Sequence, residues 1–210
     1  MSKRNEVLDN RLARYSAVLG AAAVSGIAVT DAAEAVIIHT GNANINIYQY
    51  GALTLDVNLD GYTDINLQNY VFGGNYQGAS VASFPGQLHS FTTGLTYGTA
   101  LSPGDPIDAG TVGPSFFGGL AYANNPDSQF DNITDGLIGF SFPIGAGLHF
   151  AWVSVDIDNA AGTFVVNEWA YESDPGVGIA AAAIPEPSAL GLLAAGAAGL
   201  SVMRRNRKAG

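Results

Sequence analysis

The nine residues DVNLDGYTD, which run from Asp56 to Asp64, have the residue types and spacing in this sequence that best suit a metal ion. When Asp56 is counted as position 1, side chains with oxygen atoms fall at positions 1, 3, 5 and 9. They are Asp56, Asn58, Asp60 and Asp64. Gly61 falls at position 6, where a calcium loop must turn sharply, and Tyr62 offers its backbone carbonyl at position 7. The pattern predicts one bound Ca²⁺, with a solvated hairpin turn as the alternative.

The residues beside this loop indicate which kind of calcium loop it is. An EF-hand has Glu at position 12, but Leu67 stands there. The flanks, Leu53–Leu55 and Ile65–Leu67, alternate between apolar and polar side chains as strands do. The stretch resembles the calcium loops of FG-GAP repeats, in which Asp at position 9 closes the site within a β-hairpin. This resemblance implies a calcium-stabilised hairpin between two strands.

The remaining candidates for chemistry do not form a catalytic pattern. His39, His89 and His149 are far apart, and the chain has no Cys, no Gly-x-Ser-x-Gly and no His-Glu-x-x-His. We therefore expect no enzyme activity, and a glycan hydrolase with Glu168 and Glu172 as its acid pair is the enzymatic alternative. A carbohydrate-binding module is a further alternative, because seven aromatic side chains suit either a sugar platform or cross-strand packing. They are Tyr48, Tyr50, Tyr70, Tyr76, Trp152, Trp169 and Tyr171.

The charges are divided between the ends and the middle of the chain. The protein has 210 residues and a formal net charge of −10, yet no Lys or Arg lies between Tyr15 and Met203. Most of the 18 acidic residues lie in this middle part. A nucleic-acid interface needs cations against the phosphates, so we expect no nucleic-acid partner. The absence of Lys and Arg also excludes lysine nucleophiles and arginine clamps for anionic substrates in this middle part.

Residues 1–35 contain the three parts of a secretory signal peptide in the right order. A basic region comes first, and an apolar run from Ser16 to Val29 follows it. The small residues Ala33 and Ala35 then stand at positions −3 and −1 of a cleavage site. We expect a signal helix that is removed after Ala35, which would leave Val36 as the first residue of the mature protein.

Residues 184–210 contain a second topogenic segment. Pro185, Glu186 and Pro187 are followed by an apolar run, Ala189–Met203, which is about 22 Å long as a helix. A basic tail follows and would hold this end in the cytoplasm. The order of motif, short apolar helix and basic end resembles the PEP-CTERM sorting signal. The resemblance implies a transient inner-membrane anchor, processing by an exosortase-type membrane protease, and a final place at the cell surface or outside, often beside exopolysaccharide.

The middle, residues 36–183, reads as one β-domain. Short runs of alternating apolar and polar residues are separated by Gly, Pro, Asn and Asp, and no run keeps helical spacing for three turns. Residues 149–157 predict a half-buried strand, residues 137–143 a strand that ends at its proline, and residues 158–162 a hairpin turn. Ser102–Asp135 predict long loops with one or two short strands, and these loops are either a binding region or a loosely constrained insertion.

The expected fold is all-β, an antiparallel β-sandwich of the jelly-roll kind, with a closed barrel as the alternative. A signal helix would precede it and a transmembrane helix would follow it. The expected function is that of a non-enzymatic exported protein of the cell surface or extracellular matrix. Its expected partners are the sorting protease, the membrane through the C-terminal helix before processing, and extracellular polysaccharide.

Overall fold

The computed structural model describes residues 36–71, 73–123 and 125–185, and these residues form fifteen strands. The predicted signal helix in residues 1–35 and the predicted transmembrane helix in the C-terminal segment lie outside the described residues. Among the residues described, no helix is long and apolar enough to cross a membrane. The strands are β1 (Ile37–His39), β2 (Ile45–Asn46), β3 (Gly51–Leu55), β4 (Ile65–Val71), β5 (Asn75–Val81), β6 (Leu88–Thr92), β7 (Thr96–Gly98), β8 (Ala100–Leu101), β9 (Pro106–Ile107), β10 (Pro114–Ser115), β11 (Phe117–Tyr122), β12 (Asn132–Ile144), β13 (Gly147–Asp158), β14 (Thr163–Glu172) and β15 (Ile179–Ala180).

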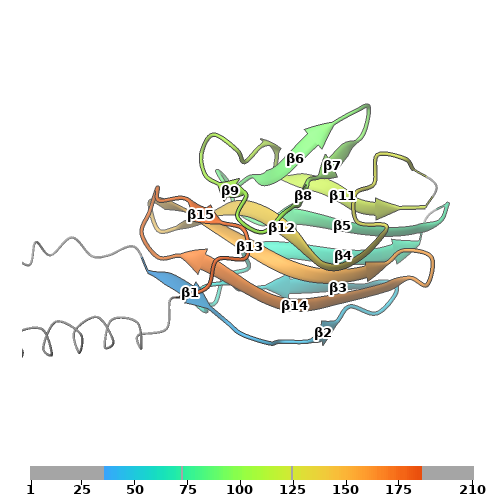
Figure 1. The fold of residues 1–210 in the computed structure, drawn as a ribbon, viewed down its shortest axis with the longest axis horizontal. Coiled ribbons are helices and arrows are strands. Elements are labelled where there is room, and N and C mark those ends of the chain that lie inside the picture. The colour runs from blue at the N-terminus through green and yellow to red at the C-terminus, as the bar shows by residue number, and fades with distance from the viewer. Residues whose placement is uncertain (1–35, 72, 124, 186–210) are drawn as a thin grey trace, which may run out of the picture. The chain divides into compact units, whose positions relative to one another are not determined.

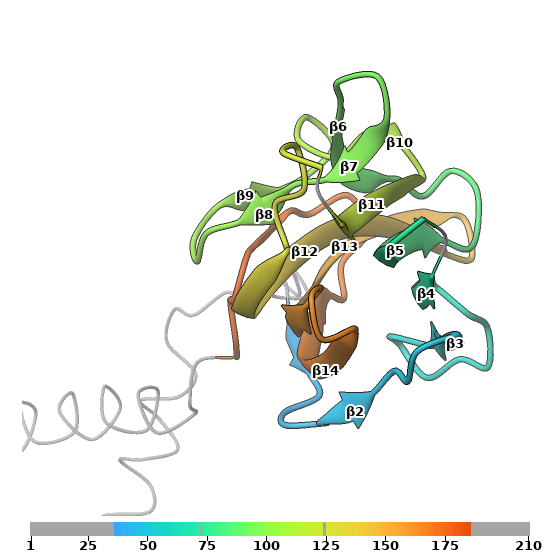
Figure 2. The same ribbon diagram turned by 90° about the vertical axis from the view of Figure 1, so that its right-hand side faces the viewer.

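Thirteen strands form one sheet, whose main path is β1-β14-β13-β12-β6-β7-β11-β5-β4-β3. The β11–β7 pair is parallel, whereas the long neighbours β12, β13 and β14 are antiparallel. The sheet curls so that its β12–β14 half faces its β3–β5 half (Figures 1 and 2). The all-β prediction is confirmed, but one curled mixed sheet stands where a sandwich would have two separate antiparallel sheets. In the described residues its two ends, β1 and β3, are not paired, so the barrel is not closed.

The main core lies inside the curl. Ile65 and Leu67 of β4 meet Phe140, Val153 and Val166 from the opposite half, and all five are essentially inaccessible to solvent. Burial of each such side chain contributes about 1.5–3 kcal/mol, so the contact between the halves is the main source of stability.

A smaller apolar cluster covers the outer face of β12 and β13. Phe150 and Trp152 are buried there beneath Ile107 of β9 and Ile179 of β15, which form a separate two-stranded sheet. The alternation in residues 149–157 predicts a half-buried strand, but β13 is buried on both faces because the β9–β15 pair covers its second side.

Strand β12 does not end at its proline. It runs on to Ile144, although Pro143 lacks the N–H that a strand neighbour would need. The Ser141 N–H donates to the carbonyl of Gln87. Alternate residues of a strand direct their N–H groups to the same side, so the backbone nitrogen of Pro143 faces the side of Gln87, just beyond this last hydrogen bond. No neighbour there requires the missing donor, and the strand tolerates the proline.

Ser102–Asp135 contain somewhat more strand than the one or two short strands that the sequence predicts, because β9, β10, β11 and the start of β12 lie there. Strand β11 spans six residues and lies between β7 and β5 in the main sheet. Its glycines lower the β-propensity that sequence patterns measure. At Gly118 a Cβ would lie 2.7 Å from the backbone nitrogen of Gly98, so the close approach of β11 and β7 requires glycine.

Two β-bulges interrupt the long strands. In β14 the register with β13 shifts at Asn167, so that Phe164 and Val166 face the core before the bulge and Trp169 and Tyr171 face it afterwards. In β12 the register shifts between Ile133 and Gly136, next to Asp135, which has a positive φ of 53°. The Asn167 amide donates to both Asp135 and Asp156, and the Asp156 carboxylate also accepts the Asp135 N–H, so side-chain bonds link the two bulges across β13.

The described domain has two ends that are chemically different. At one, which we call the proximal end, Ile37 pairs with Glu172, the last residue of β14, and β15 leads toward Pro185. At the other, the distal end, β13 turns into β14 at residues 159–162. The ten residues of β14 separate the two ends by about 30 Å. β1 and β15 are seen at the left of Figure 1.

Candidate functional site

The predicted calcium loop connects β3 and β4 at the proximal end. Leu55 pairs with Ile65, and the Asp64 N–H donates to the Leu55 carbonyl, so residues 56–64 form the loop of a hairpin. Strands flank the loop, as the sequence predicts. The backbone carbonyl of Val57 accepts the Trp169 indole N–H at 3.3 Å, which fixes the base of the loop to β14.

Hydrogen bonds from the loop's own backbone hold its polar side chains. The Asp56 carboxylate accepts the N–H groups of Asp60 and Gly61, at 3.1 and 2.7 Å. The Asp60 carboxylate accepts the Tyr62 N–H and the Asn58 amide. Gly61 has a φ of 92°, which explains why glycine suits this turn. The Tyr62 side chain is 75% exposed, so only its backbone faces the turn.

Asp64 differs from the other acids of the loop because it is buried. It is 4% exposed, and one of its oxygens accepts the Val57 N–H at 2.8 Å. Burial raises the pKa of the Asp64 carboxyl to about 6, the Val57 N–H partly offsets this, and the charges of Asp60 and Asp56 raise it further. A carboxylate at this position is therefore unfavourable at neutral pH unless a positive charge approaches it.

The loop does not form a ready-made metal centre. Within residues 36–71, 73–123 and 125–185, no three His, Asp or Glu side chains lie close enough together to hold a metal ion. The predicted ligands Asp56, Asn58, Asp60 and Asp64 lie in one hairpin loop, with the Tyr62 carbonyl beside them, but the structure lends no support to an FG-GAP-like centre. Asp56 and Asp60 would have to turn from their N–H partners to bind an ion together.

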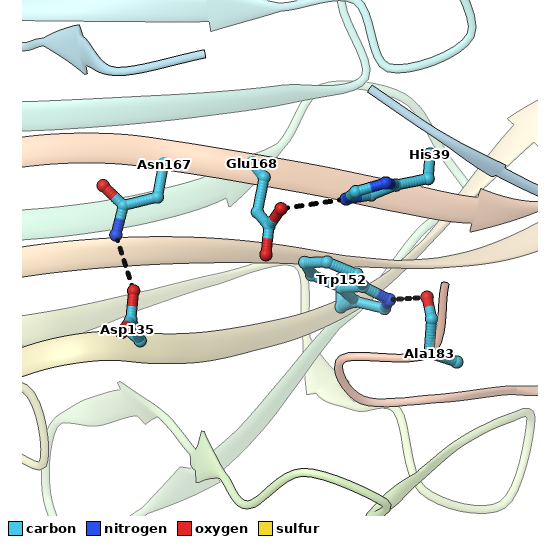
Figure 3. Close-up of polar contacts among 6 residues, drawn as sticks. All are labelled: His39, Asp135, Trp152, Asn167, Glu168 and Ala183. Carbon is cyan, nitrogen blue, oxygen red and sulfur yellow. Dashed lines mark hydrogen bonds and ion pairs between the residues drawn. The ribbon is translucent and has the colours of Figure 1, made fainter. Parts of the chain in front are cut away.

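The two ends of the described chain meet at Trp152. Its indole N–H donates to the carbonyl of Ala183 at 3.1 Å, and the His39 ring lies 5.8 Å from the indole ring, centroid to centroid (Figure 3). Two further bonds tie the last segment down, because Ala181 donates to Asp105 and accepts from Gly104. The chain is therefore part of the fold up to Ala183, two residues before the predicted sorting residue Pro185.

Most of the residues considered for catalysis have structural partners. His89 is the exception, because its Nδ1 is buried with no hydrogen-bond partner among the described residues. His39 Nε2 lies 2.9 Å from Glu168 Oε2, and this pair joins β1 to β14 beside the bulge at Asn167 (Figure 3). Glu172 is buried and accepts the Asp174 N–H. His149 is buried and its Nδ1 lies 2.9 Å from the Glu172 carbonyl oxygen.

The aromatic residues do not form the row that a sugar platform would need. Trp152, Trp169 and Tyr171 are buried in the two apolar clusters. Tyr48 and Tyr50 are exposed and flank Gln49 in the turn between β2 and β3. The role of Trp152 as the junction of both chain ends was not predicted, because its partners lie more than thirty residues away in the sequence in either direction.

Residues 183–208 match the PEP-CTERM protein-sorting motif. No curated protein and no solved structure matches the chain. The motif indicates an exported protein with a transient membrane anchor, processed by an exosortase, which is a membrane protease, before it reaches the cell surface or the extracellular space. The predicted sorting residues lie in this range, and of these Glu186 and Pro187 lie outside the described residues.

Proposed function

We propose that the chain is a non-enzymatic protein of the cell surface or extracellular matrix and that it associates there with exopolysaccharide. The sorting motif supports the location. The structural bonds of Glu168, Glu172 and His149 support a role without catalysis, because these groups are used to hold strands together. An acidic surface that lacks Lys and Arg from residue 15 to residue 203 would repel its neighbours and remain soluble.

The main support for this proposal is that the β-domain is connected directly to the sorting motif. Ala183 is the first residue of the matched motif and is also the residue whose carbonyl accepts the Trp152 indole N–H. The β-domain would therefore stay next to the membrane while the tail is anchored. Export would present this domain, rather than a separate enzyme or partner, outside the cell.

Intact-mass measurement of the exported protein tests the proposal. We expect a species that starts near Val36 and lacks Arg204–Lys208, and we expect it in the fraction that contains extracellular polysaccharide. A full-length product that stays in the cytoplasm would contradict the proposed location. A processed product that washes free of polysaccharide would contradict the proposed association alone.

A second proposal is that the Asp56–Asp64 loop binds one Ca²⁺. The support is the ligand spacing and the burial of Asp64 near two further carboxylates, with no Lys or Arg in the domain's sequence to offset them. The Tyr62 carbonyl and the Asn58 amide oxygen would complete the ligand set, with the rearrangement of Asp56 and Asp60 described above. Calcium would contribute stability by neutralising carboxylates that repel one another.

Thermal unfolding with calcium and with chelator tests this second proposal. For a dissociation constant of about 10⁻⁴–10⁻³ M, millimolar calcium should stabilise the domain by about 0.5–1.5 kcal/mol. Asp60→Ala should remove most of that effect, and Mg²⁺ should substitute poorly because it prefers tighter octahedral geometry. Equal midpoints of thermal unfolding with calcium and with chelator would mean that the loop is a hairpin turn and binds no calcium.

A further inference from the structure

An open pocket of about 600 Å³, with both polar and apolar surface in its lining, lies at the distal end. Four segments that are far apart in the sequence line it: the start of β5, the residue after β11, the start of β12 and the β13–β14 turn. Its lining residues are Gly74, Asn75, Ala123, Asp131, Asn132, Asp158, Asn159 and Ala160. Its volume lies within the range of small-molecule sites. Figure 2 looks at the domain from this side.

Buried amides fix the walls of the pocket. Asn159 donates to the Asn75 carbonyl and to Gln77, while Asn75 donates back to the carbonyls of Asn159 and Ala160. Gln77 in turn donates to Asn69, whose own amide bonds the carbonyls of Ile47 and Gly162. These bonds hold the β13–β14 turn against β4 and β5, so the pocket would need little rearrangement to bind a ligand.

The hydrogen-bonding groups left over in the pocket include carboxylate acceptors and the exposed Asn132 amide, which can both donate and accept. Both protons of the Asn75 amide and both of the Asn159 amide are already donated within the protein. By contrast, Asp131 Oδ1 is buried and has no partner among the described residues. Asp158 uses one oxygen for the Ala161 N–H, which leaves its second oxygen for a ligand. A ligand with hydroxyl groups, which both donate and accept, can therefore form hydrogen bonds with these groups.

The charge of the pocket narrows the ligand class further. Two carboxylates and no basic side chain exclude an anionic ligand. A bare metal ion would occupy a small part of this volume, and no three acidic or histidine side chains converge on one point in the residues described. A neutral ligand with many hydroxyl groups can form hydrogen bonds with the pocket and is not repelled by its carboxylates. Its hydroxyls can donate to the second oxygen of Asp158 and can bond the Asn132 amide, and it carries no negative charge.

We propose that the distal pocket binds a neutral saccharide, a unit of an uncharged polysaccharide chain. The inference rests on the proposed surface function, since it names the site and the ligand class for that association. The exposed Tyr48 and Tyr50 flank Gln49, which donates to Asn75 of the pocket wall at 2.7 Å. Their rings offer apolar surface at the pocket's side on which the C–H face of a sugar can pack.

The position of the pocket suits this role. It lies about 30 Å from the proximal end, where the described chain leaves toward the sorting motif. A tail held in the membrane would place the pocket at the far side of the domain, where a long polysaccharide chain can reach it without contacting the lipid.

Binding to the exported protein, purified from cells grown with ¹⁵N, tests the proposal by amide NMR. The probes are three neutral trisaccharides: maltotriose, cellotriose and laminaritriose. Polygalacturonate provides an anionic comparison, and CaCl₂ provides a cationic one. At least one neutral trisaccharide should shift the amide signals of Asn75, Asn132 and Asn159, and polygalacturonate should not shift them.

Two variants and their matched controls locate the site. Asn132→Arg places a long side chain in the pocket from an exposed position, and Asp158→Asn replaces the exposed carboxylate that has a free oxygen. Each should weaken binding at least about tenfold, the equivalent of 1.4 kcal/mol. Asn46→Arg changes an exposed strand asparagine outside the pocket lining, and Asp174→Asn changes a half-exposed acid at the proximal end. Both controls should bind as the wild type does.

Three results would overturn the pocket's assignment. They are no response to any neutral trisaccharide, an undiminished response in Asn132→Arg, and a response at these amides to CaCl₂ alone. If one of them occurs while the processed protein still stays with extracellular polysaccharide, the pocket inference fails and the proposed function stands. If the trisaccharides bind but the protein is not exported, the proposed function fails instead.

Discussion

The two ends of the domain hold their polar groups in different ways. At the distal end, amides such as Asn69 and Gln77 are buried and bond one another and backbone carbonyls, with no net charge among them. At the proximal end, carboxylates gather in the Asp56–Asp64 loop, and burial raises the pKa of Asp64. In a domain that has no Lys or Arg, buried amides can satisfy one another's hydrogen bonds at no electrostatic cost. Buried carboxylates, by contrast, remain sensitive to pH and to cations.

The largest effect is expected at the distal network. Asn69→Ala removes the donor to the Ile47 and Gly162 carbonyls and the acceptor for Gln77, all of them buried. Leaving these groups unsatisfied should lower the free energy of unfolding by about 3–4 kcal/mol, measured by urea denaturation. Gln68→Ala, on the neighbouring residue, should cost under about 1 kcal/mol. Similar losses in the two variants would mean that the amide network does not hold the distal end.

The next effect concerns pH at the proximal end. The folded-state pKa of Asp64 is raised above its unfolded value, so its stabilising contribution is present at low pH and is lost as pH rises through about 6. In chelator, the free energy of unfolding should fall by about 2 kcal/mol between pH 4 and pH 7 because of this group. Asp56 and Asp60 face it and strengthen the trend, while Tyr171 stays neutral over this range.

Asp64→Asn is the matched variant for this prediction, because an amide oxygen can still accept the Val57 N–H. It should remove that part of the pH dependence and raise stability at pH 7. An unchanged pH profile in Asp64→Asn would contradict the charge-based account of the proximal end.

A smaller effect is expected at the junction of the chain ends. Trp152→Phe keeps most of the buried ring but loses the bond to the Ala183 carbonyl, which should cost about 1–2 kcal/mol. The segment from Gly178 to Ala183 should then be cut faster in limited proteolysis. Trp169→Phe loses a comparable bond to Val57 without touching that segment. Faster cutting of the segment in both variants would show general loosening instead of a specific tether.

The sequence predicts local features of this fold better than its long-range arrangement. Alternation and turn residues predict the strand around Trp152 and the hairpin turn that follows it, because these depend on neighbouring residues. The bulge at Asn167 changes which side chains face the core, and no local pattern marks it. The position of β11 within residues 102–135 was not predicted, because its glycines serve a close contact with β7. The pocket depends on Asn75, Asp131 and Asp158, which only the curled sheet brings together.

Surface labelling can show whether the domain lies outside the cell with its distal end away from the membrane. The chain has no cysteine, so Ala160→Cys and Ala180→Cys introduce one thiol each at an exposed alanine of the distal or proximal end. On intact cells that hold the anchored precursor, a bulky maleimide should label Ala160→Cys rapidly and Ala180→Cys slowly. The purified processed protein should label equally in both variants. Absence of labelling at both positions on intact cells, or equal rates there, would contradict the account.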